Sequence, residues 1–189
     1  MTLLQTEQGA VRVPAGTWDA DPTHSSVGFE VKHLMIATVR GRFASFAGRL
    51  EAAEDDPSNS QAEGTVRVRS IDTGDPARDE HLRSADFFDA ERYPEITFKS
   101  TQVRHIDGGT YRIVGGLTIK DVTREVEVDA KVEGTAEDPW GNERVGISIQ
   151  GAINRTDFGL SWQKKLETGG VLVGEEVKIE IYVSAVRSG

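Results

Sequence analysis

The chain has 189 residues and a formal net charge of −9. This length suits one domain with a sizeable core. The negative charge would repel nucleic-acid phosphates and anionic lipid headgroups, which argues against a whole-protein electrostatic role with either partner and leaves room only for a local basic cluster. The absence of cysteine excludes disulfides, thiol catalysis and thiolate metal sites.

The first residues contain no basic segment followed by a long apolar run, so we expect neither a secretory signal peptide nor a membrane span there. We expect residues 1–16 to form a flexible segment and residues 17–187 to form the single domain. These features favour a cytoplasmic protein without stable membrane insertion.

From about residue 24 onward, hydrophobic residues alternate with polar ones, which is typical of half-buried β-strands. The predicted strands span residues 24–34, 39–52, 61–71, 95–106, 109–119, 122–134, 143–154 and 171–186. Eight strands, several of them long, predict an all-β fold: an extended eight-stranded antiparallel β-barrel.

One helix is expected between the third and fourth strands, over residues 75–91. Asp75 is a suitable N-cap and Pro76 a suitable first helical residue, and Pro94 follows the segment. In an antiparallel barrel alternate connections lie at opposite ends. The helix should therefore share one end with residues 33–36, the turn at Lys120 and Asp121, and the loop over 155–165.

Side chains alternate between the lumen and the exterior along each strand. We expect the lumen and its helix-bearing end to be lined by Val27, Phe29, Val31, Phe43, Leu82, Phe88, Ile96, Phe98, Ile113, Ile147, Ile149 and Trp162. An eight-stranded barrel can be filled by such side chains or can hold one small ligand, and the sequence leaves both outcomes open.

Arg124 and Arg155 continue an inward parity near the helix-bearing end. One interpretation makes this pair a structural plug that pairs with a carboxylate such as Asp157 or Asp86. The other makes them, together with His81, contacts for an anionic or carbonyl-bearing head group. Both interpretations remain open at this point.

The four histidines form no zinc-binding pattern such as HExxH, so we expect no metal site. His81 and Ser84 lie on one short helix, which does not easily provide the geometry of a catalytic triad. We therefore expect no enzyme and no cofactor.

Several motifs together resemble the YceI-like family of lipocalin-like, polyisoprenoid-binding barrels, over about residues 17–187. They are Trp18–Ser25, Phe29–Leu34, Gly41–Phe43, Arg78–Leu82, Asp86–Asp89, Tyr93–Ser100, Gly116–Ile119, and Arg155 with Asp157–Leu160. Asp121 departs from the family, which usually has glycine in this two-residue turn, although aspartate tolerates a positive φ.

The resemblance implies non-enzymatic binding of a long isoprenoid or another lipid in the lumen, with the polar head near the mouth. Expected ligands are a polyprenyl (pyro)phosphate, an isoprenoid quinone or a fatty-acid-like lipid, and expected roles are carrier, storage or sensing. A homodimer is compatible with the long strands. The alternative is a scaffold with a side-chain-filled barrel and a protein partner at the 155–170 loop.

Overall fold

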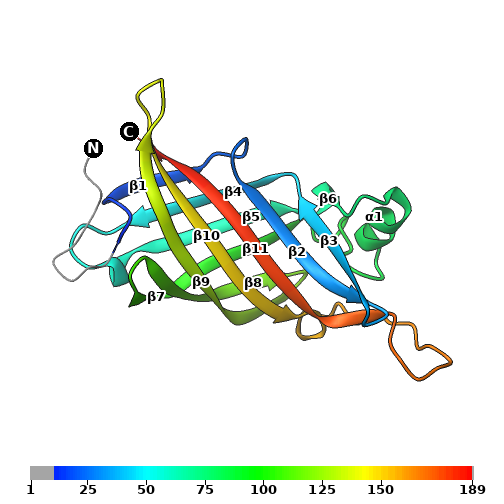
Figure 1. Cartoon of the computed structure of the whole chain (residues 1–189). Helices are drawn as coiled ribbons and strands as arrows, with labels where there is room; N and C mark the ends of the chain where they lie inside the picture. Colours follow the sequence, from blue (N-terminus) through cyan, green and yellow to red (C-terminus); the bar gives the residue numbers. More distant parts are fainter. Residues whose placement is uncertain (1–10, 189) are drawn as a thin grey trace.

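The computed structural model describes residues 11–188, which form mostly β-strands (Figure 1). The strands are β1 (Gly16–Ala20), β2 (Ser26–His33), β3 (Ala37–Phe43), β4 (Phe46–Ala52), β5 (Gln61–Arg67), β6 (Ile71–Asp72), β7 (Glu95–Asp107), β8 (Thr110–Ile119), β9 (Val122–Glu137), β10 (Glu143–Asn154) and β11 (Val173–Ser188). Helix α1 spans Pro76–Arg83, and the 3-10 helices η1, η2 and η3 span Pro57–Asn59, Val68–Ser70 and Arg155–Phe158. Within residues 11–188, no helix has the length and apolar character that crossing a membrane would need.

Eight strands close into an antiparallel barrel in the order β1-β4-β5-β7-β8-β9-β10-β11, and β11 pairs back onto β1. The closing pairs run from Thr17 opposite Ser188 to Ala20 opposite Ala185. Strands β2, β3 and β6 continue the wall beyond bends in the chain, toward the end that carries α1 (Figure 1). The predicted eight-stranded antiparallel barrel is confirmed.

Two predicted strands bend where the sequence pattern shows no break. The strand over 39–52 is divided into β3 and β4 at residues 44–45, and the strand over 61–71 is divided into β5 and β6 by η2. The two bends are joined, because Ala44 N–H donates to Ser70 O (3.1 Å) and Arg67 N–H donates to Ser45 O (2.9 Å). The alternation also misses β1, because a turn over residues 21–25 separates this short strand from β2.

Helix α1 begins as predicted, since the Asp75 carboxylate accepts hydrogen bonds from the backbone N–H groups of Ala77 and Arg78. It ends eight residues earlier than expected, at Arg83 rather than at residue 91. Ser84 is extended, and its hydroxyl donates to the carbonyl oxygen of His81 (2.6 Å). This side-chain hydrogen bond competes with continued helix, as serine commonly does.

Ten of the buried hydrophobic residues form two separate clusters, one toward each end of the barrel. The first comprises Trp18, Val103, Tyr111, Val132, Val145 and Ala185, and we call its end of the barrel the tryptophan end. The second comprises Phe87, Ile119, Phe158 and Leu160, and we call its end the helix end. Between the clusters, inward residues such as Ile147 and Ile149 are only partly buried, which indicates open space beside them.

Residues 1–10, most of the segment that we expected to be flexible, lie outside the described residues. Residues 11–15 pack against the tryptophan end. Val11 N–H donates to Gly108 O (3.0 Å), and the Tyr111 hydroxyl donates to Val11 O (2.9 Å). The Trp18 indole N–H donates to Pro14 O (2.8 Å). These hydrogen bonds hold residues 11–15 in one position.

Left-handed backbone conformations at residues other than glycine are confined, among residues 11–188, to connections at the helix end. They occur at Leu34 (φ 53°), Met35 (φ 61°), Asp89 (φ 50°) and Lys120 (φ 58°). In the turn between β8 and β9, we had expected the positive φ at Asp121. It falls instead on Lys120. At the tryptophan end, Gly108 and Gly141 take the positive φ values, at much lower steric cost.

Candidate ligand-binding cavity

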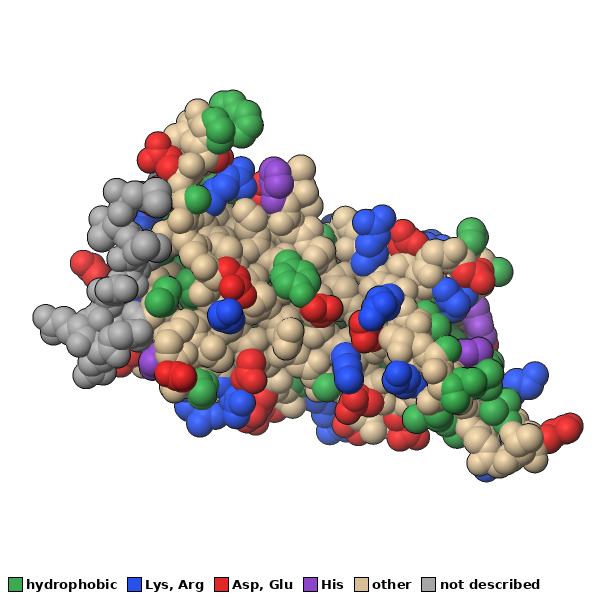
Figure 2. All heavy atoms as spheres, in the orientation of Figure 1, with side chains coloured by type: hydrophobic (Ala, Val, Ile, Leu, Met, Phe, Trp, Pro, Cys, Tyr) green, Lys and Arg blue, Asp and Glu red, His purple; other side chains and the backbone are tan. Residues whose placement is uncertain are grey.

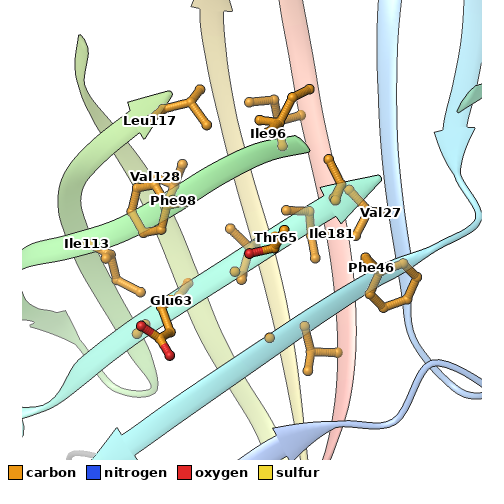
Figure 3. A pocket seen from close by; sticks show the side chains of 18 of the residues that line it. Val27, Phe46, Glu63, Thr65, Ile96, Phe98, Ile113, Leu117, Val128 and Ile181 are labelled. Carbon is orange, nitrogen blue, oxygen red and sulfur yellow. The ribbon is translucent and has the colours of Figure 1, made fainter. Parts of the chain in front are cut away.

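A cavity of about 410 Å³ occupies the barrel between the two buried clusters. Its wall is built from inward side chains of many strands, among them Val27, Ile96, Phe98, Ile113 and Ile181 (Figure 3). Nearly all of these side chains are apolar. The volume lies within the range of about 300–1,000 Å³ that is usual for small-molecule sites.

Two glycines widen the cavity beside β4 and β5. Gly48 lies opposite Gly64, and Gly64 lies opposite Phe98, which lines the cavity. A Cβ atom added to Gly48 or Gly64 would have its nearest neighbour at an ordinary 3.6 Å, so there is room at both positions. The cavity is wide here because side chains are missing, while the hydrogen-bonded pairing of the strands continues.

Two other glycines determine where two lumen rings lie. Phe29 is directly opposite Gly41 on the neighbouring strand, and a Cβ on Gly41 would overlap the Phe29 ring. A Cβ on Gly115 would likewise overlap the ring of Phe98. Glycine in a strand commonly marks such a close approach. The missing side chains therefore let both rings lie against the wall and leave the lumen free.

Most of the predicted lining residues do line the cavity: Val27, Phe29, Val31, Phe43, Leu82, Phe88, Ile96, Phe98, Ile113, Ile147 and Ile149. Trp162 does not, because it packs at the helix end against His81 and Phe87, with ring centroids 5.0 and 5.3 Å apart. That the lining residues contact a ligand stays a prediction. The prediction missed Phe46 and Gly64 on β4 and β5, which the alternation in those strands would have identified.

Arg155 closes the helix end of the cavity. Its side chain is 4% exposed, and its guanidinium donates to the carbonyl oxygens of Gly174 (2.8 Å), Trp162 (3.0 Å), Val173 (3.3 Å) and Leu160. Burial lowers the pKa of this guanidinium from its ordinary value. One side chain thus joins η3 to residues 160–162 and to the first residues of β11.

This arrangement corrects the plug interpretation in one respect. We had expected Arg155 to pair with a carboxylate such as Asp157 or Asp86, whereas its acceptors are main-chain carbonyl oxygens. The acceptors are main-chain groups of uncharged residues, so the pattern of charges in the sequence could not reveal them. With most of its N–H groups engaged in this way, Arg155 acts as a structural group.

The other two head-group candidates lie outside the cavity lining. Arg124 continues the inward parity of β9, but it is exposed, and its Nε–H donates to Asp157 O (3.2 Å). His81 Nε2 lies 2.8 Å from Asp86 Oδ2, and the His81 ring packs edge-on against Trp162. Both residues therefore secure the helix end from outside the lumen.

Gln163, like Arg155, joins the loop at the helix end to the start of β11 through hydrogen bonds to the main chain. Its Nε2–H donates to Val173 O (2.7 Å), and its Oε1 accepts from the N–H groups of Leu172 (3.1 Å) and Val173 (3.0 Å). Phe158, in the neighbouring η3, is 1% exposed. The segment over residues 159–172 is thus held on the barrel by side-chain hydrogen bonds rather than by strand pairing alone.

Residues 11–188 contain no metal-binding cluster, and Ser84 and His81 do not form a nucleophile–base pair. No group of three or more histidine, cysteine, aspartate or glutamate residues suits a metal ion there. The Ser84 hydroxyl donates to the main chain of His81 and not to its ring. The His81 ring instead meets Asp86.

Comparison with known proteins identifies relatives over most of the chain. A model of the YceI-like domain matches residues 18–185. UPF0312 proteins of Staphylococcus aureus strains Mu50 and COL are 38% and 39% identical to this chain over 161 residues. The matched region covers 85% of this chain and 91% of each relative.

Solved structures share the same barrel. BcnA of Burkholderia cenocepacia is 26% identical, with a TM-score of 0.75 over 87% of this chain and 98% of its own. The YCEI protein of Campylobacter jejuni is 26% identical, with a TM-score of 0.67 over 100% of both chains. A domain from Saccharophagus degradans described as polyisoprenoid binding has a TM-score of 0.67 over 90% of this chain and 98% of its own. At 15% identity, that last likeness concerns the fold. The family match and the Staphylococcus aureus relatives show that this chain belongs to the YceI-like family.

Proposed function

We propose that this protein binds a polyisoprenoid or another long-chain lipid in the barrel cavity and acts as a carrier, store or sensor without catalysis. The observation that carries the proposal is the apolar cavity of about 410 Å³ in the barrel, whose lining reaches from one buried cluster to the other. Its lining extends from Trp18 at one end to Leu160 at the other, which suits an elongated ligand.

Burial of a hydrocarbon chain supplies enough free energy for such binding. Each buried CH₂ group contributes about 0.8 kcal/mol, so a dozen enclosed carbons contribute roughly 10 kcal/mol before the cost of ordering the ligand. A charged head group would lose its hydration unless it were paired. At the helix end Arg155 is engaged by main-chain carbonyls, and His81 and Arg124 lie outside the lining, so an uncharged head such as that of a prenol or quinone fits better there than a pyrophosphate.

The comparisons add support of a second kind. The Saccharophagus degradans domain with the same fold is described as polyisoprenoid binding. At 15% identity this supports the class of ligand less strongly than the cavity itself does. The absence of a ring-to-hydroxyl contact between His81 and Ser84 fits a binding protein rather than a hydrolase.

The alternative, a scaffold that recruits a protein partner through the 155–170 loop, has less support. That function would use exposed aromatic residues in the loop. Phe158 is buried in the helix-end cluster, and Trp162 packs against Phe87 and the ring of His81 on α1. The aromatic residues of the loop are thus used within the molecule.

The first test is an organic extract of the purified protein, analysed by mass spectrometry, together with uptake of a fluorescent fatty acid from solution. We expect a co-purifying isoprenoid or lipid, and we expect geranylgeraniol to displace the fluorescent probe. A protein that contains no lipid and takes up neither compound would contradict the proposal.

A matched pair of variants assigns uptake to the lumen. Gly64→Leu adds a side chain where a Cβ has room and directs it into the cavity, so probe uptake should be lost while the barrel stays folded. Ala152→Leu adds similar bulk on the exposed outer face, opposite Lys178, and should leave uptake unchanged. Equal uptake by both variants would place the probe outside the cavity.

A further inference from the structure

The turn between β2 and β3 exposes three consecutive large hydrophobic residues, Leu34, Met35 and Ile36, which we call the apolar tip. Their exposed fractions are 36%, 58% and 84%. The other strongly exposed large hydrophobic residues in the described part of the chain, Ile106, Trp140 and Tyr182, are isolated from one another in the sequence. Single exposed residues are ordinary, whereas a contiguous apolar group suggests a contact surface.

The backbone of the apolar tip is strained but anchored. Leu34 and Met35 have φ values of 53° and 61°, a conformation that side-chain-bearing residues adopt at a steric cost. Two hydrogen bonds hold the turn, from Ile36 N–H to His33 O (3.2 Å) and from Leu34 N–H to Leu172 O (2.9 Å). The three side chains are therefore projected from a fixed position.

Lysines flank the apolar tip. Lys32 precedes it on β2. Lys164 is linked to it through Leu172, which accepts from Leu34 N–H and donates to Lys164 O (3.1 Å). Lys165 follows, and all three lysines are exposed; Glu167 lies at the turn of the same segment. Figure 2 shows hydrophobic side chains gathered at this end of the molecule, with Lys and Arg side chains beside them.

The apolar tip is also connected to the end of the cavity. Leu172, which accepts the hydrogen bond from Leu34, is followed by Val173 and Gly174. The carbonyl oxygens of these two residues accept hydrogen bonds from Arg155, which lines the cavity. The same short stretch of backbone thus supports the tip outside and closes the lumen inside.

We propose that the apolar tip docks the helix end of the barrel onto an anionic lipid bilayer, with Leu34, Met35 and Ile36 inserted among the headgroups and the lysines above them. The biological role of this docking rests on the proposed function, because docking would turn the helix end of the cavity toward the bilayer as a source of lipid. Apolar side chains with flanking cations are the usual elements of shallow interfacial binding.

A bilayer fits this surface better than a protein partner does. A stable protein interface needs about 800 Å² on each side and roughly 20–30 residues, whereas the tip offers three large side chains on a projecting turn. The net charge of −9 opposes long-range attraction to anionic lipid, but charges more than about 8 Å apart are largely screened at physiological salt. The charges that act are then the three lysines and Glu167 near the tip, which together remain net positive, alongside the inserted side chains.

The test is flotation of the full-length protein with vesicles of phosphatidylcholine alone or with added phosphatidylglycerol. We expect the protein to float with the anionic vesicles, and the double variant Met35→Glu, Ile36→Glu to reduce the partition coefficient at least about tenfold. Trp140→Glu is the matched control, since it removes a side chain that is 82% exposed at the opposite end, and should float like the wild type. Circular dichroism establishes that both variants are folded.

The experiment distinguishes a failure of membrane docking from a failure of lipid binding in the lumen. The Gly64→Leu variant, with its lumen filled, should still float, so loss of lipid uptake alone leaves docking intact. The proposal is overturned if the wild type floats with neither vesicle, or if the tip variant floats as well as the wild type. It is equally overturned if light scattering shows that the tip variant breaks up a dimer, because the tip would then bind a second copy.

Discussion

The two ends of the barrel are closed in different ways. The tryptophan end is filled by side chains of regular strands around Trp18, and its turns take positive φ values only at glycine. The helix end is covered by α1, η3 and an irregular segment that Arg155 and Gln163 hold through main-chain hydrogen bonds. Its turns carry positive φ values at Leu34, Met35 and Lys120.

This contrast indicates which end can open. Opening the tryptophan end would expose a continuous hydrophobic cluster and break the ladder between β1 and β11. Opening the helix end would also uncover part of the helix-end cluster, but it requires the release of an irregular segment and a few hydrogen bonds and breaks no ladder of the closed barrel. Irregular regions of this kind unfold locally at lower free energy. We therefore expect ligand exchange at the helix end, and the following changes test the contrast.

The largest effect is expected for Trp18→Ala. The side chain is 1% exposed, and its removal leaves a cavity in the tryptophan-end cluster, so the free energy of unfolding should fall by about 3–5 kcal/mol. Urea denaturation measures this change. Trp140→Ala, which removes an exposed indole, should have little effect. Equal losses in the two variants would mean that the tryptophan end is not the stable one.

Arg155→Met should have a smaller and more local effect. It removes hydrogen bonds from a buried cation to main-chain carbonyls, so we expect a loss of about 2–3 kcal/mol. Hydrogen exchange should accelerate in residues 159–173 and stay slow around Trp18, and release of the fluorescent fatty acid should become faster. Uniform acceleration over the whole barrel would argue against an independently opening helix end.

A third effect concerns the wall between the ends. Gly41→Ala places a Cβ in the position of the Phe29 ring and should push that ring into the lumen. Overpacking of this kind costs about 1–3 kcal/mol and should also weaken uptake of the fluorescent probe. Gly48→Ala is the control, because a Cβ there has space. If Phe29→Leu in the Gly41→Ala background fails to restore uptake, the ring is not the cause.

The smallest effect is a pH dependence at the tryptophan end. Hydrogen bonds from Asn142, with a contribution from Arg144, hold the pKa of Asp138 well below its usual value. A depressed pKa means that the stabilisation is fully present above the unfolded-state pKa of about 4 and is lost as pH falls through the folded-state pKa. The drop in Tm between pH 7 and pH 3 should therefore be smaller for Asp138→Asn than for the wild type. An unchanged drop would remove Asp138 from the acid response.

The regular part of this fold could be predicted from the sequence, because the alternation of hydrophobic and polar residues indicates both the strands and their inward faces. Val27, Phe29, Val31 and Ile113 line the cavity for that reason. The same rule failed at strand ends: Arg124 keeps the inward parity of β9 but extends beyond the lumen to the main chain of Asp157. Arg124 is still paired with Leu117 in the β8–β9 ladder, so alternation gives the direction of its side chain but not how far this long side chain reaches near the end of the barrel.

The irregular helix end was much less accessible. The hydrogen-bond acceptors of Arg155 are main-chain carbonyl groups, which every residue carries, so no residue type in the sequence indicates where they lie. Trp162 packs against His81 on α1, and the end of α1 depends on local hydrogen bonds such as that of the Ser84 hydroxyl, which the helical pattern does not indicate. The open lumen itself depends on small differences in side-chain volume, such as those created by Gly48 and Gly64.

The seam between β1 and β11 has a consequence for how the molecule is made. It joins residues 17–20 to residues 185–188, and the Ser188 hydroxyl reaches Asp19 across 169 residues of sequence. The ring cannot close until β11 has been synthesised, so during translation the future lumen is an open, half-apolar sheet. Such long-range pairing is slow and leaves hydrophobic surface exposed to aggregation. A lipid or chaperone that shields this sheet should therefore raise the yield of folded protein.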